Sequence, residues 1–222
     1  MPWHLVGIAR RLPVETRPDS RGNRICWVEH GDLAAAVVEG APAVFAPLDH
    51  ARALAAIHRH IDVLPVRYGA LLADEQRVCD YLSSRWQELC RDLDRLKGAS
   101  EMGLRIEMVH PLPAEELVAP NGFYGVGSSP GNYLLLRRAK YERQDRLRAQ
   151  GQLIEETSVA AVQGLYRDWR RLSPERLDIV RLAFLVERQR SEAFARRIET
   201  LNPERLGARC TCVGPLPPYS FV

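Results

Sequence analysis

The last nine residues of the sequence, 214–222, constrain its fold more than any other stretch. Pro215, Pro217 and Pro218 each fix φ at about −65° and favour extended backbone in the residue before them, so this segment loses little entropy when it packs. Tyr219 and Phe221 supply apolar area that rewards burial. The sequence therefore predicts a tail that docks on its own domain and completes a core. The alternative is a peptide presented to a partner protein.

The composition is that of an ordinary globular protein. The chain has 222 residues, of which 46% are hydrophobic and 27% are charged, so it can build a real core and global disorder is excluded. Domains commonly hold about 100 to 150 residues, which makes two domains the expectation. The net charge of +3 does not by itself indicate a nucleic-acid partner.

Cysteine and histidine spacing gives little support for a disulfide or a metal site. The 5 cysteines are irregularly spaced and no secretory leader precedes them, so we expect a reducing, cytoplasmic location. Cys210 and Cys212, alternate residues of a strand, are expected to be buried small hydrophobes. His58 and His60 point to different faces of a helix, which favours solvated side chains over metal ligands. Apolar runs such as 33–38 are too short to span a membrane.

The first hundred residues alternate between strand and helix patterns. Strands are predicted at 3–9, 25–28, 33–38 and 63–72, with an amphipathic helix at 49–61. Asp74 is placed to cap one continuous helix that ends at Gly98. Its apolar stripe recurs at steps of three and four residues, through Val78, Leu82, Trp86, Leu89, Leu93 and Leu96.

The second half predicts a further mixture of strands and helices. Strands are expected at 101–108, 177–186 and 206–213, and a helix at 191–201. Residues 132–172 are predicted to form two helices, or one helix bent near Gly151. The fold class is therefore α+β, with domains at 1–98 and 99–222 that each pack helices on a mixed sheet. The second domain is expected to be a modified ferredoxin-like unit that carries the proline-aromatic tail.

Two sets of basic residues stand out. Arg67 lies within an apolar strand, where it is either a surface charge or the partner of a carboxylate at a buried edge. The start of the 132–172 region is strongly basic, with Glu142 and Asp145 interrupting Arg137, Arg138, Lys140, Arg143, Arg146 and Arg148. A solvated helix face is the simpler interpretation, and an acidic protein or a polyanion is the alternative.

No local motif for catalysis is present, so the chain is predicted not to be an enzyme and to need neither cofactor nor metal. Glu101 and Glu107 are expected on a solvated strand edge. The glycine-rich stretch 125–131 misses the spacing of a phosphate-binding loop, and Pro130 removes an amide donor. Nucleic-acid binding would rest on the basic helix alone, without stacking aromatics, and is not expected.

Several separated segments together resemble the gas vesicle proteins of the GvpF/GvpL family. The ending Gly214-Pro-Leu-Pro-Pro-Tyr-Ser-Phe-Val222 is the most specific of them. The inner segments are Leu5–Ile8, Val63–Gly69, Gly98–Leu104, Gly131–Leu134 with the arginines that follow, and Ala183–Val186. The sequence departs from the family pattern at Leu216, where an aromatic residue is usual, and at Asn132, where lysine is common.

The resemblance implies a cytoplasmic accessory protein of gas vesicle assembly, associated with the vesicles. Its expected partners are the shell protein GvpA and other Gvp proteins, and its expected role is that of a chaperone or nucleation factor. The alternative is a minor structural component bound to the mature vesicle. The matching motifs mark possible interaction residues, namely Arg67, Tyr68, Gly69, Arg137, Arg138, Pro217, Pro218, Tyr219 and Phe221.

Overall fold

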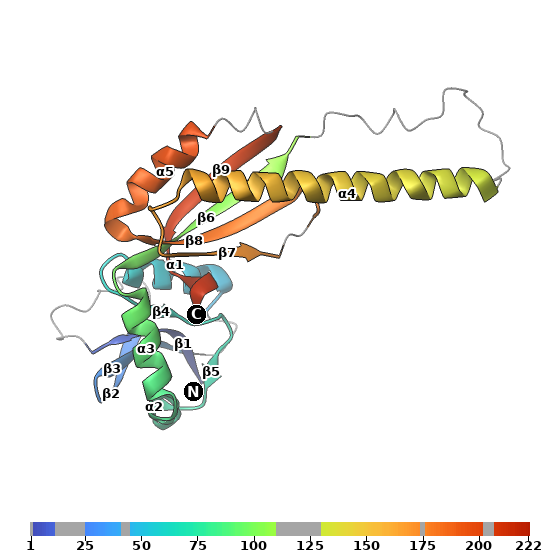
Figure 1. Ribbon diagram of the computed structural model, residues 1–222. Coiled ribbons are helices and arrows are strands. Elements are labelled where there is room, and N and C mark those ends of the chain that lie inside the picture. The colour runs from blue at the N-terminus through green and yellow to red at the C-terminus, as the bar shows by residue number, and fades with distance from the viewer. Residues whose placement is uncertain (1, 12–24, 41–44, 110–129, 174–175, 202–206) are drawn as a thin grey trace. The chain divides into compact units, whose positions relative to one another are not determined.

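The computed structural model describes residues 2–11, 25–40, 45–109, 130–173, 176–201 and 207–222 (Figure 1). The chain forms two compact units that interleave along the sequence. The first unit contains residues 1–102, 185–191 and 214–222, and the second contains 103–184 and 192–213. The structure thus groups the tail with the first unit, whereas the sequence analysis assigned it to the second domain. The boundary between residues 98 and 99 stays a proposal.

The first unit is built on a 5-stranded sheet with the order β2-β3-β1-β4, in which β5 also pairs with β1. Its strands are β1 (Trp3–Arg10), β2 (Ile25–His30), β3 (Leu33–Glu39), β4 (Leu64–Pro65) and β5 (Leu71–Leu72). Its helices are α1 (Pro47–His58), α2 (Glu75–Ser84) and α3 (Trp86–Leu96). The pairings within this sheet are antiparallel, so it is not the mixed sheet that was expected.

Helices cover both faces of this sheet, with α1 on one face and α2 and α3 on the other (Figure 1). The apolar side of α1 packs on β1 and β3 in a buried cluster that excludes water. The cluster consists of Val6, Ala36, Val38, Phe45, Ala53, Leu54, Ile57 and Val63. Its strand residues Ala36 and Val38 are two apart, and its helix residues Ala53, Leu54 and Ile57 recur at steps of three and four. These are the periodicities from which β3 and α1 were predicted.

The predicted single helix from Asp74 to Gly98 is two helices, which is a correction. Asp74 caps α2 as expected, since its side chain accepts a hydrogen bond from the Arg77 amide at 2.9 Å. The break falls at Arg85, whose φ of −112° and ψ of 15° are not helical. Two serines precede it, and serine is a weak helix former that favours helix ends. The apolar stripe continues across the break, so periodicity alone could not reveal it.

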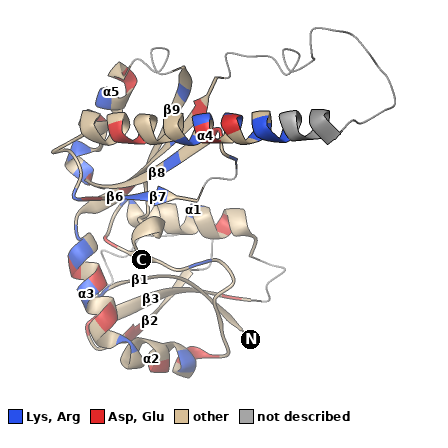
Figure 2. Ribbon diagram, turned by 45° about the vertical axis from the view of Figure 1, so that its right-hand side comes forward, with Lys and Arg blue, Asp and Glu red and all other residues tan. Residues whose placement is uncertain are grey.

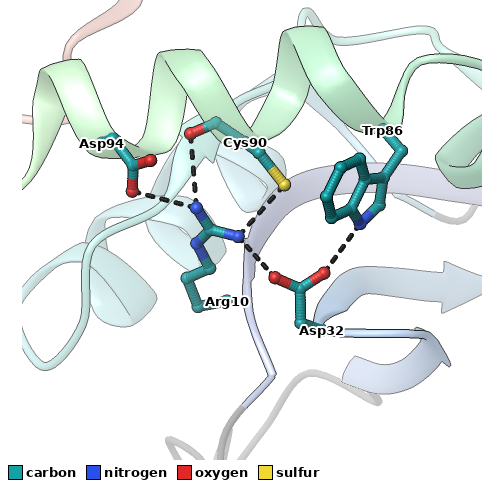
Figure 3. Close-up of polar contacts among 5 residues, drawn as sticks. All are labelled: Arg10, Asp32, Trp86, Cys90 and Asp94. Atoms are coloured by element: carbon teal, nitrogen blue, oxygen red, sulfur yellow. Dashed lines mark hydrogen bonds and ion pairs between the residues drawn. The ribbon is translucent and has the colours of Figure 1, made fainter.

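The guanidinium of Arg10 joins the end of β1 to α3 and to the β2–β3 turn (Figure 3). Its Nη1 donates to Asp32 Oδ2 at 2.6 Å and to Cys90 Sγ at 3.0 Å, and its Nη2 donates to Asp94 Oδ1 at 2.9 Å. The Trp86 indole donates to the other Asp32 oxygen at 2.7 Å, which is the main cause that lowers the pKa of Asp32. This network fixes the first residue of α3 and therefore the direction of the helix.

The second unit is built on a 4-stranded sheet with the order β7-β8-β6-β9. Its strands are β6 (Ala99–Met108), β7 (Asp168–Leu172), β8 (Ile179–Glu187) and β9 (Ala208–Leu216). Its helices are α4 (Pro130–Ala161) and α5 (Ser191–Thr200). The short 3-10 turns that follow β8 (Arg188–Arg190) and β9 (Tyr219–Phe221) belong to the first unit, as do the first residues of β6. The order β-α-β-β-α-β and this strand arrangement are those of a ferredoxin-like unit. The α+β fold class is confirmed.

The strand β7 was missed, because residues 162–172 were assigned to the helical region. The helix ends at Ala161, and Gly164 then adopts a φ of +83°, a left-handed conformation that ends the helical path. Trp169 of β7 stacks on Phe184 with ring centroids 6.4 Å apart, which ties this polar strand to the core. A strand in which one half-buried aromatic side chain stands between charged residues leaves a weak sequence signal.

The helix α4 runs through Gly151, where the sequence analysis expected an interruption or a bend. The reason for glycine is close approach, since a Cβ there would lie 3.1 Å from Cε of Met108 and 3.5 Å from Cγ2 of Val180. Gly151 therefore marks the place where α4 packs directly on β6 and β8.

We expect Arg10→Lys to lower the free energy of unfolding by about 1 kcal/mol, because a lysine ammonium cannot reach the turn and α3 together as the planar guanidinium does. The effect is small because the Arg10 side chain is 38% exposed. Urea unfolding of the full chain measures it. Arg52→Lys is the control, since Arg52 is 69% exposed and 4.0 Å from Asp49. An equal loss in both variants would contradict this role of Arg10.

Candidate functional site

The proline-aromatic tail is held in the first unit by its own buried residues and by side chains from two other elements, β6 and α3. After β9 the chain passes through Pro217 and Pro218, both buried, into the 3-10 turn Tyr219–Phe221. Phe221 is completely buried, with 0% of its surface exposed. Burial of a whole phenylalanine side chain contributes about 2 to 3 kcal/mol. The tail is thus part of the core of its unit.

A carboxylate from β6 holds the turn in place. Glu101 is only 7% exposed and accepts two hydrogen bonds from Ser220, one from the backbone N–H at 2.8 Å and one from the hydroxyl at 2.8 Å. The expectation that Glu101 lies on a solvated strand edge was therefore wrong. A buried carboxylate needs such donors, because an unpaired charge away from water is costly.

An arginine from α3 holds the residue that follows. Arg95 Nη2 donates to the backbone carbonyl of Phe221 at 2.5 Å, and its guanidinium also pairs with Asp92 at 2.8 Å. Asp92 lies one turn before Arg95 on the same helix and so orients it. Donors and acceptors on α3 and β6 together fix the backbone of residues 220 and 221.

The other side of the tail is exposed. Leu216 is 39%, Tyr219 40% and Val222 53% exposed, although all three side chains are apolar or aromatic. Partial burial raises the pKa of Tyr219, so its hydroxyl stays protonated at neutral pH. The tail motif therefore separates into buried residues, which fix its conformation, and exposed residues, which remain accessible to a partner.

The predicted residues Arg67, Tyr68 and Gly69 follow β4 and lie at the surface of the first unit. The Tyr68 hydroxyl donates to the Phe45 carbonyl at 3.0 Å, and the Tyr68 ring meets the His50 ring edge-on at 5.8 Å. Gly69 has a φ of +91°, which favours glycine in this turn. Of the two interpretations of Arg67, its exposure agrees with a surface charge.

Two histidines of α1, His50 and His58, are buried, and the expectation that His58 is solvated was wrong. His50 donates from Nε2 to the Val66 carbonyl at 2.9 Å, and burial lowers its pKa. His58 lies 2.8 Å from Ser100 through Nε2 and 3.3 Å from an Arg188 nitrogen through Nδ1. Since the guanidinium can only donate, Nδ1 is the acceptor and Nε2 carries the proton. Burial, followed by the Arg188 charge, lowers the pKa of His58 from 6.5 to about 4.

The predicted residues Arg137 and Arg138 lie on exposed positions of α4 in the second unit. Arg138 pairs with Glu142 at 2.8 Å, and the Arg137 guanidinium lies over the Tyr141 ring, 5.7 Å from its centroid. The structure therefore does not bring them together with the tail in one compact unit.

Within the described residues, no three histidine, cysteine, aspartate or glutamate side chains are grouped to hold a metal ion. Cys210 and Cys212 are half-buried, and burial raises the pKa of Cys210 to about 11. Residues 125–129 of the glycine-rich stretch lie outside the described part of the chain. No helix in the described ranges is long and apolar enough to cross a membrane.

Sequence reasoning missed Glu101, Arg95 and Ser220, which hold the tail. The local pattern is misleading for Glu101, which stands at the start of a strand where Leu104, Ile106 and Met108 then alternate with charged residues. On that alternation Glu101 falls on the face of Gly103 and Arg105, which predicts exposure. The tail, more than a hundred residues later in the sequence, supplies two hydrogen bonds to its carboxylate.

The fold and the tail define a class of protein: two α+β units, one of them ferredoxin-like, with a proline-aromatic ending locked by buried side chains. A family model described as "Gas vesicle synthesis protein GvpL/GvpF" matches residues 3–222. The chain belongs to this family, as its motifs indicated.

Comparisons with individual proteins agree with the family. Gas vesicle protein F of Streptomyces sp. (strain CB03234) is 28% identical over 203 residues, which cover 85% of this chain and 84% of the relative. The crystal structure of GvpF from Anabaena sp. PCC7120 matches with a TM-score of 0.71 and 15% identity, over 99% of this chain and 95% of that one. The crystal structure of GvpF from Microcystis aeruginosa matches with a TM-score of 0.68 and 13% identity, over 99% of this chain and 98% of that one. The two structures support the fold.

We expect Phe221→Ala to lower the free energy of unfolding by about 3 kcal/mol or more, because it leaves a cavity in the core. Tyr219→Ala, at an exposed neighbouring position, is the matched control and should cost well under half as much. Thermal and urea unfolding of the full chain measure both. Equal stability of Phe221→Ala and wild type would show that the tail is not part of the core.

We expect the stability of the protein to fall on acidification because of His58. The unfolded histidine takes up a proton near pH 6.5, while the folded one does so only near pH 4, so the unfolded state binds more protons between these values. This difference removes about 2 kcal/mol between pH 7 and pH 5.

Urea unfolding at several pH values tests this expectation. His58→Gln, which cannot be protonated, should show a shallower loss of stability than wild type over that range. His60→Gln, at an exposed position, should retain the wild-type pH dependence. Parallel curves for wild type and His58→Gln would rule out His58 as the source.

Proposed function

We propose that this chain is an accessory protein of gas vesicle assembly that binds the shell protein GvpA and other Gvp proteins and acts as a chaperone or nucleation factor. The observation that supports it most strongly is the match of residues 3–222 to a family of gas vesicle synthesis proteins. In this proposal the protein acts by binding, not by catalysis, in the cytoplasm and at the growing vesicle.

A physical reason for such a binder follows from the nature of a shell. A subunit that polymerises into an apolar-faced wall exposes hydrophobic surface or strand edges before it is incorporated, and such surfaces aggregate. A globular protein that covers them transiently keeps the subunit available and can deliver it to a nucleus.

The exposed side of the tail is the proposed contact for the shell protein. Leu216, Tyr219 and Val222 present apolar and aromatic area on a backbone that the buried residues already hold in one conformation. Pre-ordering reduces the entropy lost on binding, which favours this segment over a flexible one. Phe221, at 0% exposure, serves only to anchor it.

A binding assay with purified shell protein tests the proposal. Leu216→Ser combined with Tyr219→Ser should reduce shell-protein binding about tenfold without a matching loss of thermal stability, because both side chains are exposed. The control is Leu153→Ser, at a position 57% exposed on α4. Equal binding by the tail variant and wild type would exclude the tail as the contact, and a wild-type chain that binds no Gvp protein would refute the assembly role.

Fractionation separates the transient factor from a structural component. A chaperone or nucleation factor should be released when purified vesicles are washed. Retention in a fixed ratio to the shell protein would instead establish a minor structural component.

A further inference from the structure

The helix α4 carries one continuous stripe of residues whose surroundings change halfway along it. Lys140, Arg143, Leu147, Gly151, Ile154 and Ser158 follow one another at steps of three and four, so they lie on one helix face. Ile154 and Ser158 are each only 1% exposed, and Gly151 is buried against the sheet. Lys140 and Arg143 are exposed, and Leu147 is only partly buried. The face that packs on the sheet therefore continues along the helix to positions that are exposed or only partly buried.

The part of α4 that precedes Gly151, residues 137–150, is named the α4 arm. Figure 1 shows α4 extending past the strands of its unit. None of its residues is buried. Short helices without a packed face are marginally stable in water, and a helix that is polar on all sides gains stability when it meets a partner. Among the described residues, the buried positions of α4 therefore begin only at Gly151, after the arm.

The α4 arm carries charges of both signs along its length (Figure 2). Glu142 and Asp145 lie away from the stripe, where they pair with Arg138 at 2.8 Å and with Arg148 at 2.9 Å. Lys140 and Arg143, on the stripe itself, have no acidic partner among the described residues. Outside the stripe, Glu142 and Asp145 offset part of the arginine charge, so the whole arm is positive. The stripe differs in that neither of its two cations is paired with an acid among the described residues.

We propose that the stripe of the α4 arm binds an acidic helix of a partner protein. Steps of three and four residues are the geometry with which one helix packs along another. Lys140 and Arg143 select glutamate or aspartate on the facing helix. Leu147, which follows them on the stripe, offers that helix an apolar contact. This interaction goes beyond the proposed binding of the shell protein by the tail and does not require it.

A protein helix fits the arm better than a nucleic acid does. Phosphate backbones are bound by runs of cations along a surface, and the affinity rises with the number of phosphates neutralised. Here Glu142 and Asp145 lie on the same turns and would repel phosphates. The aromatic side chain nearby, Tyr141, is engaged with Arg137, whose nitrogens lie 3.3 Å from its hydroxyl.

A synthetic peptide of about 20 residues tests the proposal on the full chain. It carries glutamates at three- and four-residue spacing on one helix face, with a leucine among them. Lys140→Glu with Arg143→Glu should weaken its binding at least about tenfold. Arg138→Glu with Arg146→Glu changes the net charge by the same amount on the other side of the arm and should weaken binding less than about threefold.

A charge exchange keeps the result independent of folding. A peptide with lysine in place of each glutamate should bind the Lys140→Glu, Arg143→Glu variant more tightly than it binds wild type, which a misfolded variant could not do. Three results would overturn the proposal: no binding of the acidic peptide, equal weakening by both variant pairs, or tighter binding of duplex DNA of equal charge than of the peptide.

Discussion

The hydrogen bonds between the Glu101 carboxylate and Ser220 connect parts of the chain that are far apart in sequence. A carboxylate buried on β6 needs donors, and the tail supplies two of them. Phe221 is held beside them by Arg95, so its ring stays in the core. The three contacts act on two neighbouring tail residues, so loss of any one weakens the hold on the others.

Periodicity revealed those elements that bury one regular face. The helix α5, with Phe194 and Ile198 buried, and the strands β1, β3 and β8 were predicted close to their observed bounds. The break at Arg85 was not, because the apolar stripe of α2 continues in α3. The strand β7 was missed because Trp169 is its one aromatic residue and stands among charged residues. In both cases contacts distant in sequence decide the local structure, namely Asp32 for Trp86 and Phe184 for Trp169.

The candidate site was predictable only in part for the same reason. The tail was recognised from its prolines and aromatic residues, which are local features. The burial of Glu101 and His58 was not, because Ser220 and Arg188 cover or contact them from the other end of the chain. A polar residue in a sequence shows what it can donate or accept, while its partner determines whether it faces water. The arginines of α4 were located correctly on a helix, and their division into two sides required the sheet.

The interleaving of the two units has a consequence for how the protein is made. The bond from Arg95 to the Phe221 carbonyl closes a loop of 126 residues, and the second unit is synthesised within that loop. The residues of the second unit are therefore synthesised before the last residues of the first unit. The core position of Phe221 in the first unit is therefore filled only after residues 214–222 have been synthesised.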